Sequence, residues 1–209
     1  MRKIINRKNS GWRGVFSILL ISLLLLSYTS CSEDDSAADE YANWQERNET
    51  AINQYAADNS YRKIRTYTQD DTTAGKNSDY IYVKVLEIGT GTESPLFTDT
   101  VRVAYRGRII PTTSYPDGLV FDETYLNDFS WQTANMSDFV TGEMVNGFAT
   151  ALMNMHKGDR WQVMIPYQLG YGTSSTNSIR GYSNLIFEIA LLDFWHIGDS
   201  RPAFRARKK

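Results

Sequence analysis

The sequence predicts an α+β domain in which an antiparallel sheet packs on a single short helix. Strand-like runs lie on both sides of one helical stretch, turn residues separate these runs, and the helical stretch has a 3.6-residue apolar period. Strands and helices grouped in this way are typical of the α+β class. The chain has 209 residues, of which 42% are hydrophobic, which is enough for one domain of ordinary size with appendages.

The first strands of this domain are expected between residues 79 and 110. β-Branched and aromatic side chains fill residues 80–88, and the Gly-Thr-Gly at residues 89–91 then supplies a turn. In residues 101–106, Val101, Val103 and Tyr105 alternate with Arg102, Ala104 and Arg106, as side chains do on a half-buried strand. Two prolines and a glycine within residues 111–118 predict a segment that bulges away from the sheet.

The helix is expected at residues 143–157, and two more strands follow it. Val145, Phe148, Ala149 and Leu152 have the spacing that places side chains on one helix face. Gly158 is expected to cap the helix in the left-handed conformation. Alternation at residues 161–165 and an apolar run at residues 185–192 predict the last two strands.

The first thirty residues have the layout of a secretory signal. Five basic and no acidic residues precede a short apolar run at residues 15–26, and small residues then lead to Cys31, the single cysteine of the chain. The apolar run is shorter than the roughly 20 residues that a transmembrane helix needs. The residues before Cys31 resemble a lipobox, which implies an exported protein held to the outer membrane by a lipid on that thiol. An ordinary signal peptide with a chance cysteine is the alternative.

Residues 31–78 are expected to form a polar tether with one amphipathic helix inside residues 39–57. Acidic residues directly after Cys31 resemble the surface-export tag of Bacteroidetes-type lipoproteins, or they are a solvated linker, so the periplasmic and cell-surface faces both stay open. Without the signal, 17 basic and 24 acidic residues give a net charge of −7, which argues against nucleic acid as a partner. Residues 196–209 form a basic tail, interpreted as a solvated end or as a phospholipid contact.

Five short motifs occur in order between residues 79 and 195. They read V-x-V-x-Y-x-G at 101–107, G-x-x-F-D at 118–122, a glycine- and alanine-rich helical stretch at 142–158, I-P-x-x-L-x-Y-G at 165–172, and L-x-F at 185–187. In this order and spacing they resemble the FKBP-type peptidyl-prolyl cis–trans isomerases. The resemblance implies a half-barrel sheet wrapped around the short helix, with a shallow apolar pocket that receives the proline of a polypeptide substrate.

The resemblance also implies which residues form the pocket. Tyr171 would offer its hydroxyl to a substrate carbonyl, Asp122 would bond within the wall to Tyr105, and Phe148 would be the floor, where the family has tryptophan. Phe129 or Trp131 would add one more wall ring. The implied catalytic residues are Tyr105, Phe121, Asp122, Tyr171 and Phe187, and the implied substrate-binding residues are Met144, Val145, Phe148 and Ile179.

Such a pocket suits isomerisation without a cofactor. Rotation about an Xaa-Pro bond faces a barrier of roughly 20 kcal/mol because the planar amide is conjugated. An apolar pocket favours the twisted, less polar state over the hydrated planar state. We therefore expect neither cofactor nor metal, and a monomer that acts on proline-containing polypeptides.

The chain departs from the family in the loop before its last strand. Ile179 is kept, but the two prolines that follow it in the family are absent, so a non-catalytic peptide- or partner-binding lipoprotein is the alternative function. Residues 124–141 also differ, as a partner-binding flap or as a differently packed strand. A hydrolase is disfavoured because neither of the two histidines, His156 and His196, has an obvious Ser or Cys partner.

Overall fold

The computed structural model describes residues 40–70, 72 and 74–201. The predicted signal, the predicted lipidation site Cys31 and the tail beyond Arg201 lie outside these residues. The described residues from Tyr41 to Arg201 belong to one compact unit. Within the described part of the chain, no helix is both long and apolar enough to span a membrane.

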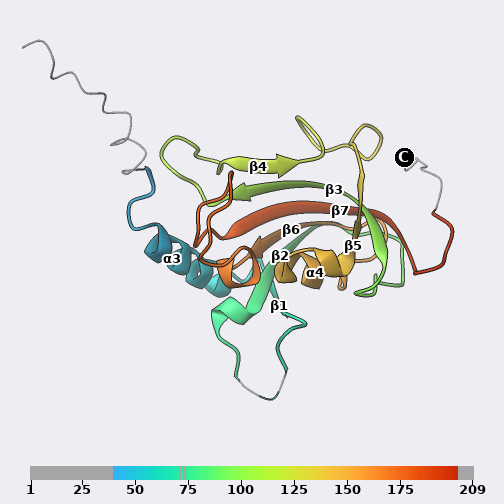
Figure 1. Cartoon of the computed structure of the whole chain (residues 1–209), viewed down its shortest axis with the longest axis horizontal. Helices are drawn as coiled ribbons and strands as arrows, with labels where there is room; N and C mark the ends of the chain where they lie inside the picture. Colours follow the sequence, from blue (N-terminus) through green and yellow to red (C-terminus); the bar gives the residue numbers. More distant parts are fainter. Residues whose placement is uncertain (1–39, 71, 73, 202–209) are drawn as a thin grey trace, which may run out of the picture. The chain divides into compact units, whose positions relative to one another are not determined.

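One antiparallel sheet dominates this unit (Figure 1). Among the described residues it has seven strands in the order β1-β2-β6-β7-β3-β4, and β5 also pairs with β3. The strands are β1 Arg62–Arg65, β2 Tyr80–Glu87, β3 Thr100–Ile109, β4 Val120–Glu123, β5 Ser137–Val140, β6 Arg160–Ile165 and β7 Leu185–Trp195. The sheet is open rather than a closed barrel, so the predicted α+β half-barrel is confirmed.

The long central strands carry the core. β3 and β7 pair over nearly their whole length, with Gly107 opposite Phe187 and Ala104 opposite Ala190. Because strand side chains alternate between the two faces, Val103 and Phe187 join the main core on one face, while Ala104 and Ala190 join a second cluster on the other. The sheet therefore has an inner face, covered by helix α4, and an outer face.

Helix α4, Asn146–Leu152, lies along the inner face and is shorter than the predicted 143–157. Its first part is replaced by the 3-10 turn η2, Thr141–Glu143. The helix stops at Leu152 because the chain then turns back to the sheet. The Asn154 side-chain amide donates to the Thr150 carbonyl, and the Gly158 backbone N–H donates to the Leu191 carbonyl. Gly158 does have a positive φ of 91°, but it forms the turn into β6 rather than a helix cap.

Helix α3, Trp44–Ala57, packs on the domain, which the sequence had left open. Asn48 is fully buried, and its side chain and carbonyl bond the backbone and side chain of Asn184 at 2.8 and 2.7 Å. Trp44 Nε1 donates to Ser183 Oγ at 2.9 Å. Strand β1 then pairs with β2, so the segment that the sequence predicts as a tether contributes a helix and an edge strand to the sheet unit.

Candidate active site

A cavity of about 260 Å³ opens between the start of α4 and the sheet. Strands β3, β4, β5 and β7 supply side chains from the sheet, and the segment before α4 and the turn after β6 close the other sides. The lining residues are Tyr105, Phe121, Asp122, Phe139, Glu143, Met144, Val145, Phe148, Tyr171 and Phe187.

Aromatic rings pack edge-to-face around this cavity. Phe187 is central, with ring centroids 4.9 Å from Phe148, 5.5 Å from Phe121 and 6.2 Å from Tyr105. Such geometry places the positive edge of one ring against the negative face of the next. Phe148 and Phe187 are 4% and 5% exposed, so they form a fixed apolar base.

Gly107 makes room for these rings. A Cβ atom at this position would lie 2.5 Å from the Phe187 ring and 2.6 Å from the Phe121 ring, closer than carbon atoms approach. The glycine of the V-x-V-x-Y-x-G motif therefore lets two aromatic side chains pack across strand β3.

Two tyrosine hydroxyls and the Asp122 carboxylate are the polar groups beside the rings, and the exposed Glu143 adds a second carboxylate at the edge of the cavity. Tyr105 donates a hydrogen bond to Asp122 Oδ2 at 2.7 Å, which confirms the predicted contact. Burial and this bond raise the pKa of Tyr105 above its usual value. Tyr105 is thus a protonated donor that fixes the orientation of the Asp122 carboxylate.

Tyr171 is the free donor of the wall. Its side chain is 43% exposed, and the described residues provide no hydrogen-bond partner for its hydroxyl. Burial, and secondarily the charge of Asp122, raise the pKa of Tyr171 above the ordinary 10. The hydroxyl stays protonated at neutral pH and can donate to a carbonyl that enters the cavity.

The structure brings eight of the nine predicted pocket residues to this cavity, and Ile179 is the exception. Phe139 and Glu143 line it without having been predicted. Phe139 occupies the place of the extra wall ring expected from Phe129 or Trp131, which lie instead in the cluster on the outer face. A half-buried Phe on the four-residue strand β5 gives no usable period. The signal for Glu143 is its position directly before Met144, a residue of the helical motif.

Residues 91–192 match the family model described as FKBP-type peptidyl-prolyl cis-trans isomerase. The chain contains an FKBP-type domain. The matched range covers all the cavity residues above.

Several known proteins are similar to this chain over part of its length. A protein of Trypanosoma cruzi named macrophage infectivity potentiator is 34% identical over 116 residues, 55% of this chain and 53% of that protein. The outer membrane protein MIP of Legionella longbeachae is 34% identical over 110 residues, 52% of this chain and 42% of that protein. The chain thus spans about half the length of the curated relatives it matches. The crystal structure of FkpA from Escherichia coli shares the fold, with a TM-score of 0.56 and 22% identity over 90% of this chain and 75% of that one.

The loop at residues 173–181 has no proline after Ile179, and other contacts hold it in place. Ile179 is 5% exposed and packs in the core, so it anchors the loop rather than lining the cavity. The Thr176 hydroxyl accepts from the backbone of Ser178 and Ile179 at 3.3 and 3.0 Å. At Gly181 a Cβ atom would lie 2.2 Å from the Thr173 carbonyl, so a side chain there would disrupt the loop. A substrate-binding role for Ile179 remains a prediction.

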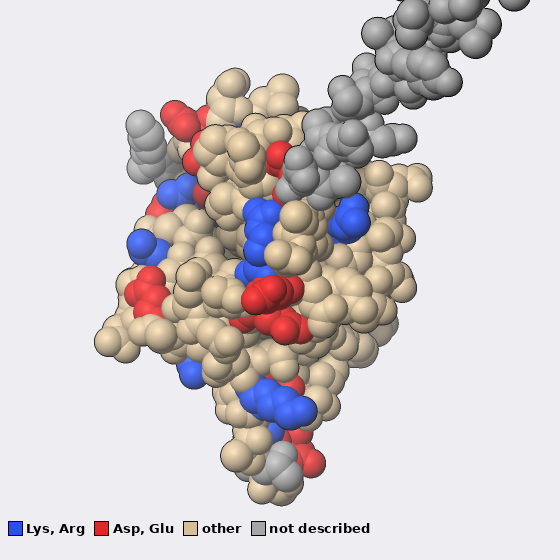
Figure 2. Space-filling view, turned by 90° about the vertical axis from the view of Figure 1, so that its left-hand side faces the viewer, with Lys and Arg blue, Asp and Glu red and all other residues tan. Residues whose placement is uncertain are grey.

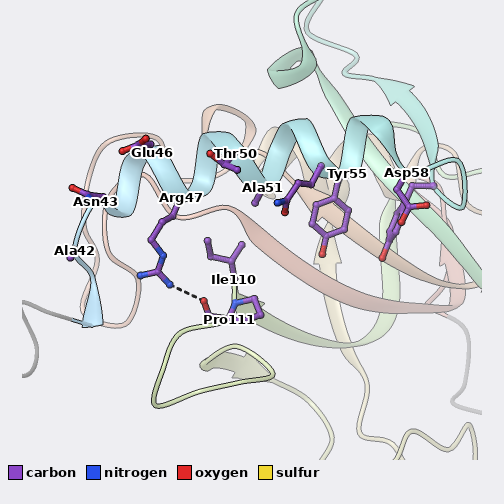
Figure 3. A pocket seen from close by; sticks show the side chains of 12 residues that line it. Ala42, Asn43, Glu46, Arg47, Thr50, Ala51, Tyr55, Asp58, Ile110 and Pro111 are labelled. Atoms are coloured by element: carbon purple, nitrogen blue, oxygen red, sulfur yellow. Dashed lines mark hydrogen bonds between the residues drawn. The ribbon is translucent and has the colours of Figure 1, made fainter.

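A larger and more open hollow of about 810 Å³ lies beside α3 (Figure 3). The Arg47 guanidinium reaches across it to the Pro111 carbonyl at 3.0 Å, and Tyr55 and Ile110 also line it. On the face that carries α3, basic and acidic side chains lie close together (Figure 2). This hollow mixes polar and apolar groups and lies outside the ring cluster, so the FKBP cavity is the better candidate site.

The described residues contain no cluster of side chains that could bind a metal ion. No group of three or more His, Cys, Asp or Glu side chains in residues 40–70, 72 and 74–201 is arranged to hold an ion. The His156 ring nitrogen lies 3.7 Å from Asp159, and the His196 ring nitrogen lies 2.8 Å from Asp99, so each imidazole has a carboxylate beside it.

Proposed function

We propose that this protein is a peptidyl-prolyl cis–trans isomerase that assists the folding of exported, proline-containing polypeptides. The observation that carries the proposal is the cavity itself. It combines Phe187 and the three rings packed on it with the Asp122 carboxylate and the unpaired Tyr171 hydroxyl. A proline ring fits a cavity of about 260 Å³, and no nucleophile is needed for rotation about a bond.

The cavity accelerates rotation by binding the twisted amide better than the planar one. The planar Xaa-Pro amide is polar and well hydrated, and twisting it removes the conjugation that makes the barrier roughly 20 kcal/mol. Phe148 and Phe187 exclude water from the proline ring, which disfavours the planar state relative to the twisted one. Tyr171 holds the substrate by a carbonyl, and Asp122, fixed by Tyr105, presents a charge that orients the amide dipole.

Export and lipid anchoring at Cys31 complete the proposal. They are supported by the signal-like layout of residues 1–30, the lipobox-like approach to Cys31, and the similarity to a protein named as an outer membrane protein. The lipid would tether the catalytic domain to the outer membrane, on its periplasmic or its cell-surface side.

A non-catalytic peptide-binding lipoprotein is the second candidate, and the absence of the loop prolines favours it. The two functions differ in one quantity, the rate at which a bound Xaa-Pro bond interconverts. A binding module would hold a peptide in the same cavity without changing that rate.

Isomerisation by the full chain in detergent micelles tests the proposal. NMR exchange spectroscopy would measure cis–trans interconversion of peptides with a single Xaa-Pro bond. We expect acceleration by the protein and a three- to tenfold lower kcat/KM in Tyr171→Phe, the effect of one lost hydrogen bond. Because Tyr171 is exposed and unpaired, this variant should keep its stability. Peptide binding without acceleration would refute the isomerase and leave the binding module.

A further inference from the structure

Another hollow, of about 480 Å³ and distinct from the one beside α3, adjoins the proline cavity. It is lined by Tyr41, by residues 119–121 on and before strand β4, and by residues 175–180 of the loop described above. Phe121 lines both spaces, with its ring in the inner-face cluster and its residue in the wall of this hollow. A polypeptide leaving the proline cavity along β4 would therefore enter this hollow.

Strand β4 favours an extended chain along this route. It pairs with β3 on one side, and among the described strands it stands at the end of the sheet order. The edge of a sheet presents backbone groups that an added extended segment can pair with. An extended chain advances about 3.3 Å per residue, so a few residues suffice to pass from one space to the next.

Arg180 gives the hollow its charge. Its guanidinium lies over the Tyr41 ring at 5.2 Å, its residue is exposed, and no carboxylate of the described residues lies within 4 Å of it. Arg102, Arg106 and Arg160 differ, because each has a carboxylate at 2.7 to 2.9 Å. Arg180 is thus held in place by an aromatic face while its charge remains available.

The loop holds Arg180 at a defined position. Its neighbour Ile179 is anchored in the core, and the Ser175 hydroxyl accepts from the Gly181 backbone at 2.9 Å on the other side. Arg180 stacks on Tyr41, which lies three residues before the start of α3. Hydrogen bonds between Asn48 of α3 and Asn184, just after the loop, hold the helix beside the loop. The site therefore exists because α3 docks on the domain.

We propose that this hollow is a second substrate subsite, in which Arg180 binds an acidic side chain of the polypeptide a few residues from its proline. The inference rests on the proposed function for the proline in the first cavity. The proline cavity carries Asp122 and the exposed Glu143, so an acidic side chain is repelled there and attracted at Arg180. Because the proline cavity is acidic and the neighbouring hollow is basic, we expect the acidic side chain of the substrate to lie on the Arg180 side of the proline.

The test compares peptides that differ only in charge. Each peptide has one proline and a Glu two, three or four residues from it, on either side, and its partner has Gln at that position. NMR titration of the full chain in detergent micelles would give the dissociation constants, and exchange spectroscopy would separately give isomerisation of the Gln peptides. We expect at least one Glu peptide to bind about threefold more tightly than its Gln partner, as suits one solvent-exposed ion pair.

Arg180→Gln and Arg62→Gln provide the matched variants. Arg62 is also exposed and stacked on a ring, that of Trp161 at 5.1 Å, but it lies on β1 at the opposite edge of the sheet. The Glu preference should disappear in Arg180→Gln, persist in Arg62→Gln and shrink at high salt. Equal affinity for all Glu and Gln pairs, or a preference that survives in Arg180→Gln, would overturn the subsite. A preference without isomerisation of any peptide would keep the subsite and refute the isomerase.

Discussion

Two aromatic clusters lie on opposite faces of the same sheet and differ in what surrounds them. The inner cluster comprises Tyr105, Phe121, Phe148 and Phe187, and the outer cluster comprises Tyr125, Phe129 and Trp131. Both pack edge-to-face, with ring centroids 4.9 to 6.2 Å apart in the inner cluster and 5.0 to 5.3 Å in the outer one. Ring geometry alone does not distinguish them.

The outer cluster is closed by polar partners. Tyr125 donates to Glu188 at 2.9 Å, Trp131 donates to Glu87 at 2.8 Å, and Arg160 lies over the Phe129 ring at 5.0 Å. Its hydrogen-bonding groups are thus satisfied by side chains of the sheet. The outer cluster fastens residues 124–136 to the sheet and leaves no donor for a ligand.

The inner cluster is open. Tyr105 and Asp122 satisfy each other, but the rings border a cavity, and the Tyr171 hydroxyl beside them bonds no described residue. Aromatic content is therefore a poor marker of a binding site. An apolar cavity with an unused donor is the better one.

The largest expected effect is that alanine substitution in the outer cluster lowers stability, whereas alanine substitution in the inner cluster lowers activity. Trp131 is 8% exposed, so Trp131→Ala should lower the free energy of unfolding by about 3 kcal/mol while the folded fraction keeps kcat/KM within twofold. Phe121→Ala, at a half-buried position, should lower kcat/KM at least tenfold and cost about 1 kcal/mol. Urea unfolding and peptide isomerisation would measure both. A folded Trp131→Ala protein without activity would show that the outer cluster also controls the cavity.

A smaller effect should come from two matched tyrosines. Tyr105→Phe and Tyr125→Phe each remove one hydrogen bond to a carboxylate, at 2.7 and 2.9 Å. Each should destabilise the protein by about 1 to 2 kcal/mol. Tyr105→Phe alone should lower kcat/KM, about fivefold, because the Asp122 carboxylate loses its fixed orientation. Equal losses of activity in both variants would contradict the division between the two faces.

The smallest effect should be that of pH between 7 and 9. Burial and the Asp122 charge raise the pKa of Tyr171 above 10, so its hydroxyl remains a donor throughout this range and is lost only at higher pH. Burial and Glu188 likewise raise the pKa of Tyr125 on the outer face. We expect kcat/KM to change less than twofold from pH 7 to 9. A decline with a midpoint below pH 9 would mean that the Tyr171 hydroxyl is not shielded.

The sequence by itself determined the long strands, the fold class and most of the cavity. β2, β3, β6 and β7 are six to eleven residues long, and their alternation or apolar runs are legible without a structure. Tyr105, Phe121, Asp122 and Phe187 lie in motifs whose order resembles one family, and the central strands bring them together. The strands β1, β4 and β5 have four residues each, too few for a period, so β1 and β4 were not predicted, and β5 was expected only as a strand somewhere in residues 124–141, one of two alternatives.

Tertiary structure decided the parts that depend on contacts between distant residues. Asn48 and Asn184 are 136 residues apart in the chain, and their bonds dock α3 on the domain, which the local polarity of residues 31–78 did not indicate. Ile179 anchors a loop instead of lining the cavity, and Phe139 lines it in place of Phe129 or Trp131. The physical reason is the same in each case: residue type fixes what a side chain can bond, but the pairing of strands fixes which face it occupies and what it meets there.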